Sequence, residues 1–159
     1  MVIWMGIGVL ALALVLGGWV WFGHRGSEPP VPMDLPTPSE ADRERIVDLC
    51  VYLALELSRV DGAIVDSEIK AIEDQLMRGL DDRTREEAEE IVRRVLKRTI
   101  SVDQDSGAVD EISRLADLAH RRFLVEMLTA VAMADGEVNV DERTFAEPIA
   151  SRLGVPFEV

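Results

Sequence analysis

Carboxylates recur at matching positions in two segments of the chain. Asp61 precedes a glycine and is followed seven residues later by Glu68, and Asp135 and Glu142 repeat this arrangement 74 positions further on. Oxygen-only side chains of this kind suit a hard cation such as Ca²⁺ or Mg²⁺. These carboxylates, together with Glu137 in the second segment, are therefore a candidate metal site. Two further carboxylates, Asp66 and Asp141, are candidate additional ligands.

The same residues also fit a purely structural role. A glycine after each aspartate permits a tight turn with positive φ, and Ile64 and Val138 are apolar residues that can return to the core. Glu68 and Glu142 fall in the first turn of the next helix, where a carboxylate can accept free backbone N–H groups. Neither loop follows the EF-hand pattern. The sequence favours turn architecture and leaves metal binding open.

The elements around these turns show helical periodicity and no alternating strand pattern. We expect an all-α domain with six helices. The first starts near Ser39 and Asp42 and runs to about residue 59, and the third starts near residue 82. The others cover about 67–79, 108–119, 121–134 and 140–153, and Pro148 is expected to kink or delay the last one.

The two acidic turns belong to a longer internal match. Twenty residues from Leu53 align without a gap with twenty from Met127. A repeat of this kind indicates duplicated helix–turn–helix units. The predicted fold is therefore a compact helical bundle of two pseudo-symmetric halves.

The chain begins with an apolar segment. Residues 2–22 carry no formal charge, and a helix of this length would extend about 30 Å, which matches the hydrocarbon thickness of a bilayer. Trp4, Trp19 and Trp21 lie near its ends, as in an aromatic belt. We expect a single transmembrane anchor over residues 1–23, with a cleaved signal peptide as the rival. Arg25 follows the segment, so the positive-inside rule places the C-terminal domain in the cytoplasm.

A proline-rich linker follows the anchor. Five of the seven prolines fall in residues 24–40, a composition typical of an extended spacer. The folded domain is expected over residues 41–159. Within the anchor, Ala13 and Gly17 are four residues apart, a spacing of small residues at which transmembrane helices can pack together. A homodimer formed through the anchor is therefore an alternative to a monomer.

Composition and charge exclude several functions. A formal net charge of −13 argues against binding nucleic acid. Cys50 lies on an apolar helical stripe and is expected to be an inert core thiol, and His120 sits at a helix junction with a surface or capping role. There is no Gly-rich phosphate loop. The chain is therefore not expected to be an enzyme.

The third expected helix is graded in charge. Acidic residues come early and basic ones late, which complements the helix dipole, and Glu89–Arg93 and Glu90–Arg94 form i,i+4 pairs. A solvated, self-stabilised helix explains this pattern. Contact of its basic end with anionic lipid headgroups is the alternative.

Two stretches carry a resemblance to a known family. LSRVDGAIVDSEI and AVAMADGEVNVDERTFAEPIASRLGV resemble the tellurite-resistance TerB family and the TerB-like domain of membrane-anchored DjlA-type co-chaperones. The resemblance implies seven or eight helices in two pseudo-symmetric halves. It also implies metal binding by the acidic turn residues, which correspond here to Asp61, Glu68, Asp135 and Glu142. A role in stress responses at the bacterial membrane is implied as well. The chain has no His-Pro-Asp, so Hsp70 stimulation by a J domain is not implied. Pro148, inside the last expected helix, is a second departure from the family pattern.

Together these features predict a single-pass protein of the bacterial inner membrane. Its cytoplasmic domain would recruit a protein partner, with Ca²⁺ or Mg²⁺ as a regulating ion. The alternative is a protein that binds or senses divalent metal during tellurite or metal stress. A metal-dependent hydrolase using the acidic cluster has less support, because nothing in the sequence demonstrates a water-activating metal.

Overall fold

The computed structural model describes residues 37–60, 62–79, 82–98 and 105–159. These ranges contain six helices and no strand, so the predicted all-α class is confirmed. None of the helices in these ranges combines the length and the apolar character that crossing a bilayer requires. The predicted anchor, residues 1–23, lies outside the described residues, as does most of the linker.

The helices follow one another with short connections. They are α2 (Glu40–Leu57), α3 (Asp66–Arg78), α4 (Arg85–Lys97), α5 (Asp105–Leu115), α6 (Leu118–Ala132) and α7 (Val140–Leu153). The bounds of α7 agree with the prediction. Helix α4 begins later than expected, because Thr84 is its N-cap and Glu87 accepts the Thr84 backbone N–H at 2.8 Å.

The boundary between α5 and α6 also differs from the prediction. Helix α5 ends at Leu115 instead of near residue 119, and α6 begins at Leu118 instead of near residue 121. Asp117 is the N-cap of α6, and its Oδ1 accepts the His120 backbone N–H at 3.0 Å. An N-cap aspartate stabilises a helix start, which explains why α6 begins here.

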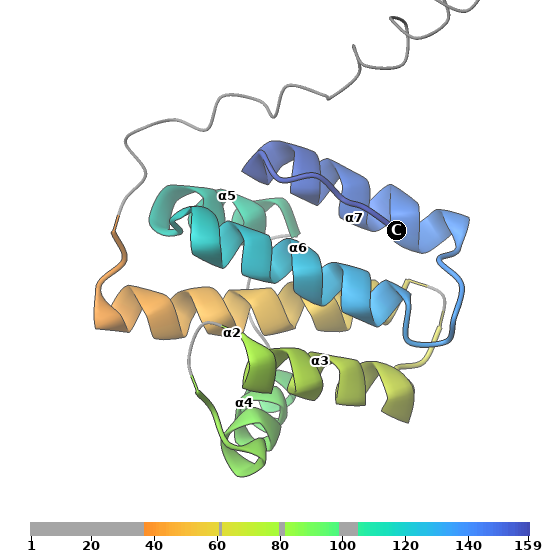
Figure 1. Cartoon of the computed structure of the whole chain (residues 1–159), viewed down its shortest axis with the longest axis horizontal. Coiled ribbons are helices and arrows are strands. Elements are labelled where there is room, and N and C mark those ends of the chain that lie inside the picture. Colours follow the sequence, from red (N-terminus) through yellow and green to blue (C-terminus); the bar gives the residue numbers. More distant parts are fainter. Residues whose placement is uncertain (1–36, 61, 80–81, 99–104) are drawn as a thin grey trace, which may run out of the picture. The chain divides into compact units, whose positions relative to one another are not determined.

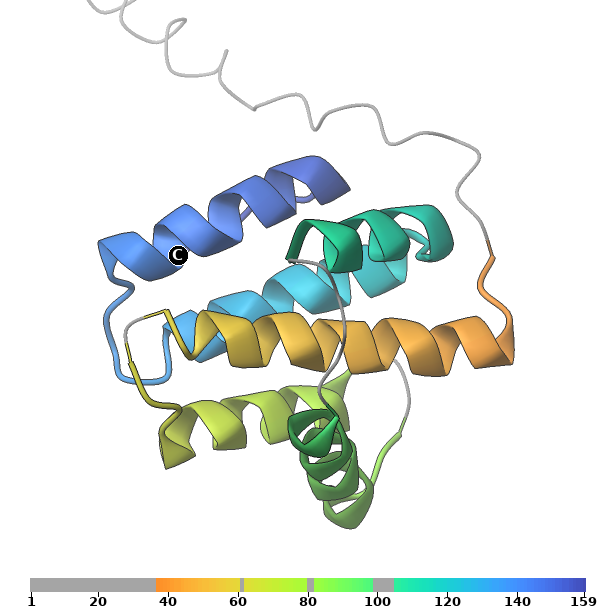
Figure 2. The ribbon, with the colours of Figure 1, turned by 180° about the vertical axis from the view of Figure 1, so that it is seen from behind.

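Helix α2 lies at the centre of the bundle and contacts each of the other five helices (Figure 1; Figure 2). Most of its residues from Ile46 to Leu57 are buried on every side. A helix that is apolar all round needs neighbours all round, and α3, α4, α5, α6 and α7 supply them. Helix α6 runs beside α2 and also packs on α3 and α7.

One close approach fixes α3 against α6. A Cβ built on Gly79, at the end of α3, would lie 2.3 Å from Cε2 of Phe123 on α6. Only a glycine therefore lets the aromatic ring of Phe123 lie against the backbone at the end of α3.

Pro148 does not interrupt α7, which continues from Val140 to Leu153. Proline removes one backbone donor, so the carbonyl of Thr144 lacks its usual partner. Both residues are exposed, and water can hydrate that carbonyl. The helix is closed at its end by Gly154, whose φ of 70° is left-handed.

The ion pairs of α4 differ from those expected. Arg93 pairs with Glu90, at 2.6 Å, instead of Glu89. Arg94 pairs across the fold with Asp48 on α2, at 2.5 Å, instead of with Glu90. Spacing along one helix identifies the residues that can pair, but a buried carboxylate on a neighbouring helix competes more strongly for the same guanidinium. The basic end of α4 thus fastens the helix to α2.

Candidate functional site

Both Asp-Gly turns lie at the same end of the bundle. Figures 1 and 2 show the α2–α3 and α6–α7 connections close together on one side, seen from opposite directions. Helices α2 and α6 run side by side toward this end, and α3 and α7 lead away from it. The acidic segments that the sequence singled out therefore belong to one surface.

Each of the two turns contains the same backbone hydrogen bond at its glycine. In the first, the Gly62 N–H donates to the Arg59 carbonyl at 3.3 Å. In the second, the Gly136 N–H donates to the Met133 carbonyl at 3.1 Å. Gly62 has φ of 147° and Gly136 has φ of 102°, a region that other residues rarely adopt. A Cβ at either position would meet no atom within 4 Å, so backbone conformation and not space requires glycine.

The two glutamates act as helix caps. Glu68 accepts the Val65 backbone N–H at 2.8 Å, and Glu142 accepts the Asn139 backbone N–H at 2.8 Å. Both side chains are buried. Each satisfies a donor at a helix start that has no partner within the helix. The structural role proposed for these residues is thus present, with Oε2 of each carboxylate engaged.

The caps are not identical. Oδ1 of Asn139 accepts the backbone N–H groups of Asp141 and Glu142, both at 2.9 Å, which completes a reciprocal capping box. Val65 holds the equivalent position before α3, and its side chain has no acceptor. Only the glutamate half of the box exists there.

The remaining predicted ligands are exposed. Asp66 and Asp141 lie in the first turns of α3 and α7, and Asp135 lies in the second turn, where its Oδ1 accepts the Glu137 backbone N–H at 3.3 Å. Asp61 lies outside the described residues. Among those that are described, no three Asp, Glu, His or Cys side chains are arranged to hold a metal ion. The site offers exposed carboxylates on one face, and metal ligation stays a prediction.

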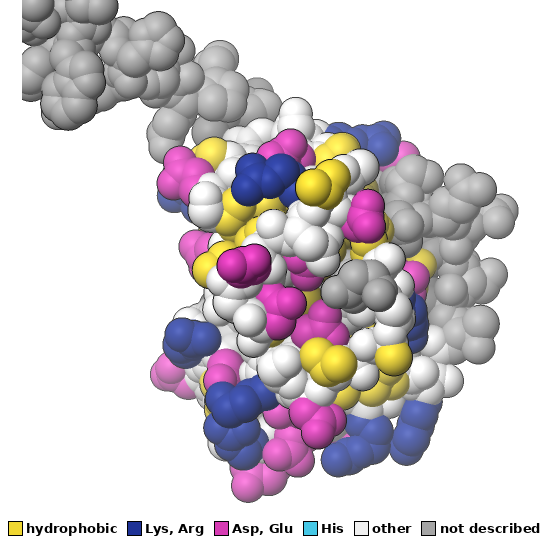
Figure 3. All heavy atoms as spheres, turned by 90° about the vertical axis from the view of Figure 1, so that its right-hand side faces the viewer, with side chains coloured by type: hydrophobic (Ala, Val, Ile, Leu, Met, Phe, Trp, Pro, Cys, Tyr) yellow, Lys and Arg dark blue, Asp and Glu magenta, His cyan; other side chains and the backbone are white. Residues whose placement is uncertain are grey.

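Figure 3 looks onto this end of the molecule. Acidic side chains gather near the centre of the face, with hydrophobic side chains beside them. The acidic residues of the two turns that the structure describes as exposed are Asp66, Asp135, Glu137 and Asp141. Such a face can attract cations or positively charged groups of a partner.

The thiol and the imidazole occupy structural positions. Cys50 is fully buried, as predicted, and burial raises the pKa of its thiol far above the ordinary value. His120 is also buried, so the expected surface position was wrong; Asp117, the N-cap of α6, accepts its backbone N–H. Burial acts to raise the pKa of the Asp117 carboxyl, but the hydrogen bonds from the His120 backbone and ring together lower it. His120 Nδ1 lies 2.6 Å from Asp117 Oδ1.

A buried carboxylate on α2 escaped the sequence analysis. Asp48 accepts hydrogen bonds from Arg94 at 2.5 Å and from Arg98 at 2.8 Å. A charged residue between Val47 and Leu49 in a buried stripe was the available signal. The partners could not be identified, because they lie 46 and 50 residues away in the chain.

Arg121 is a second buried charge with a structural task. Its guanidinium donates to the backbone carbonyls of Ser113, Ala116 and Leu153, at 2.6, 3.1 and 3.4 Å. Burial lowers the pKa of this arginine. These contacts tie the ends of α5 and α7 to the start of α6.

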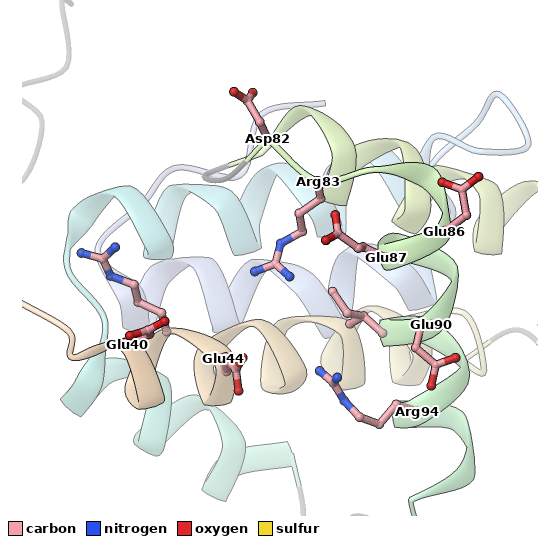
Figure 4. Close-up of a pocket in the computed structure, with 10 residues that line it drawn as sticks. Glu40, Glu44, Asp82, Arg83, Glu86, Glu87, Glu90 and Arg94 are labelled. Carbon is pink, nitrogen blue, oxygen red and sulfur yellow. The ribbon is translucent and has the colours of Figure 1, made fainter.

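A cleft of about 890 Å³ opens between the first turns of α2 and the face of α4 (Figure 4). Its lining includes six carboxylates and three guanidinium groups, and no thiol, imidazole or hydroxyl side chain. Two of these charges already serve the fold, since Glu87 caps α4 and Arg94 binds Asp48. Apart from Ile91, the cleft is therefore lined by charged side chains only.

Comparison with known families gives one match. The family model of the tellurite resistance protein TerB matches residues 47–158, a range that includes both acidic turns. Searches of curated proteins and of solved structures find no match. A match that covers most of the chain, on an all-helical domain, carries the assignment: the chain belongs to the TerB family.

Proposed function

We propose that this chain is a membrane-anchored interaction module that recruits a protein partner to the bacterial inner membrane in a stress response. The observation that carries this proposal is the position of the two Asp-Gly turns, which bring exposed carboxylates from two distant segments to one end of the bundle. Membership of the TerB family supports the link to tellurite resistance. The duplicated turns serve as two arms of one binding surface.

The anchor part of the proposal comes from the sequence. The uncharged segment 2–22 is long enough to span a bilayer, and the proline-rich stretch up to residue 40 supplies a spacer of about 3.1 Å per residue. The domain then reaches partners in the cytoplasm without lying against the headgroups. Its acidic charge favours this separation, because inner-leaflet lipids are anionic.

A pull-down with the full-length chain tests recruitment. The tagged chain is isolated from crosslinked membranes, with Ca²⁺ or with a chelator, and associated proteins are quantified. We expect one protein to be enriched at physiological salt. Enrichment should fall at least threefold when Asp135→Asn, Glu137→Gln and Asp141→Asn are combined. The matched control neutralises three carboxylates of the cleft, Glu40→Gln, Glu44→Gln and Glu86→Gln. Failure to enrich any protein would count against recruitment.

Divalent-cation binding at the same turns is the second candidate function. It is favoured by the exposed carboxylates Asp66, Asp135 and Asp141, which lie in the two turns at one end of the bundle. Calorimetry of the full chain with Ca²⁺ and with Mg²⁺ tests it directly. Combining Asp61→Asn with Asp135→Asn should weaken binding at least tenfold, whereas Asp82→Asn in the cleft should not change it. Unchanged heat and affinity in the double variant would exclude these carboxylates as ligands.

We propose no catalytic activity. A metal-dependent hydrolase needs a metal with an open coordination position for water, and no observation on the described residues favours one. The proposal therefore rests on binding alone.

A further inference from the structure

Exposed hydrophobic side chains collect at the end that carries the two turns. Val65 is 49% exposed just before α3, Met133 is 45% exposed at the end of α6, and Val140 is 78% exposed at the start of α7. The other large exposed hydrophobics among the described residues are Leu96 on α4 and Val159. An exposed group of this kind marks an interaction surface more often than an isolated side chain does.

Turn architecture does not require these hydrophobic residues. At the offset of 74 positions, Met133 corresponds to Arg59, Val140 to Asp66 and Val65 to Asn139. In each case the other turn places a polar or charged residue at the equivalent position while keeping the same glycine and capping glutamate. The backbone therefore accepts a polar side chain there, and the hydrophobic residue is available for another role.

Carboxylates lie next to these hydrophobic residues along the chain, and two arginines of the same segments are already paired. Asp66, Glu137 and Asp141 are exposed and form no ion pair with another described residue. Arg59 is paired with Glu56, and Arg143 is paired with Glu147 at 3.1 Å. Figure 3 shows the resulting mixture of acidic and hydrophobic side chains on this face. The surface defined by Val65, Met133, Val140 and these three carboxylates is called the turn face below.

We infer that the turn face binds a basic amphipathic helix of a partner protein, with its apolar side against Met133 and Val140 and its Lys or Arg side chains toward the carboxylates. This inference rests on the proposed recruitment function and names the chemistry of the partner. Charge complementarity selects this occupant. Anionic lipid would be repelled by the same carboxylates, and so would a second copy of a chain whose formal charge is −13.

Site-specific crosslinking in cells tests the inference. The full-length chain carries photoreactive benzoylphenylalanine at position 140, and the crosslinked peptide is sequenced by mass spectrometry. Control probes replace Leu96, an exposed hydrophobic residue on α4, and Glu44, which lines the acidic cleft. We expect position 140 to capture a segment with apolar residues three or four apart and with several Lys or Arg residues. Positions 96 and 44 should capture this segment at least fivefold less.

A second variant borrows residues from the other turn. Met133→Arg with Val140→Asp installs what the first turn has at Arg59 and Asp66, so the thermal unfolding of the domain should change little. Recovery of the partner in a pull-down should fall at least tenfold, whereas Leu96→Asp should leave it unchanged. Raising NaCl from 0.05 to 0.5 M in permeabilised cells should also reduce crosslinking from position 140.

The outcomes separate the inference from the proposed function. A crosslink from position 140 to an acidic segment, to lipid or to a second copy of this chain overturns the inference. If a protein co-purifies but crosslinks best from position 44, the inference fails and recruitment stands. If nothing co-purifies and position 140 captures nothing, both fail.

Discussion

Removing the Asp48 carboxylate should destabilise the domain by about 2 kcal/mol. Its side chain is only 9% exposed, and it accepts hydrogen bonds from Arg94 at 2.5 Å and Arg98 at 2.8 Å. A hydrogen bond to a charged group contributes about 1.5–3 kcal/mol. The two guanidinium groups are 36% and 56% exposed, so in Asp48→Ala water can hydrate both. The expected loss is therefore closer to the contribution of one such bond than of two.

The two arginines should contribute unequally. Arg94 is closer to Asp48 and less exposed than Arg98, so Arg94→Ala should cost more stability than Arg98→Ala. Salt should weaken the contribution of Arg98 more, since exposed charges are screened more effectively. A double-mutant cycle for each arginine with Asp48→Ala isolates these pairwise energies.

Thermal unfolding of the full chain, followed by circular dichroism in detergent, measures these effects. For a domain of this size, 2 kcal/mol corresponds to a decrease in Tm of roughly 6–12 °C. Glu90→Ala is the control, because the Glu90–Arg93 pair is exposed and should contribute less than about 0.5 kcal/mol. The reasoning is refuted if Asp48→Ala costs no more than Glu90→Ala, or if Arg98 contributes more than Arg94.

Three further perturbations have defined outcomes. Val65→Asn supplies the side-chain acceptor that Asn139 provides in the other turn and should stabilise the domain by about 1 kcal/mol in denaturant unfolding; a loss of stability would show that the two helix starts are not equivalent. Cys50 should react with a thiol reagent only as the domain unfolds, because it is buried and its pKa is raised, and stoichiometric labelling of the native protein would contradict this. Arg45 holds the pKa of the Glu111 carboxyl below its ordinary value, so the pair stabilises the fold above that ordinary pKa, and this contribution is lost as pH falls through the lowered pKa. Glu111→Gln should therefore flatten the acid limb of the stability curve, and an unchanged limb would count against the pair.

Local signals in the sequence predicted much of the fold. Helix α7 has the expected bounds because Asn139 and Gly154 are strong start and stop residues, and because an exposed Pro148 costs the helix one hydrogen bond without ending it. The α5–α6 boundary was misplaced, because the aspartate that caps α6 could equally have continued a helix.

Contacts across the fold were harder to predict than the helices themselves. The expected Glu90–Arg94 pair follows a correct rule for an isolated helix, but Arg94 faces α2 and binds Asp48 there. Packing determines which side of α4 meets which side of α2, and one sequence does not reveal it. The same limit applies to the cleft between α2 and α4, whose lining residues come from segments about 40 positions apart.

The sequence identified the carboxylates of the candidate site, and the structure divides those that it describes into two groups. Glu68 and Glu142 are buried caps, whereas Asp66, Asp135 and Asp141 are exposed. Spacing alone treats all carboxylates of a motif as equivalent, because it carries no information on burial. The proximity of the two turns required the packing of α2 beside α6.

Differences between the two turns are more informative about function than their similarities. The residues that both turns share have structural explanations. The glycine adopts a positive φ, the apolar residue (Ile64 or Val138) packs against the core, and the glutamate caps the next helix. Met133 and Val140 have no such explanation, because the other turn keeps the same glycine hydrogen bond with Arg59 and Asp66 at these positions. An internal repeat thus acts as its own control: what both copies keep supports the fold, and what one copy changes on the exposed surface is the place to look for a partner.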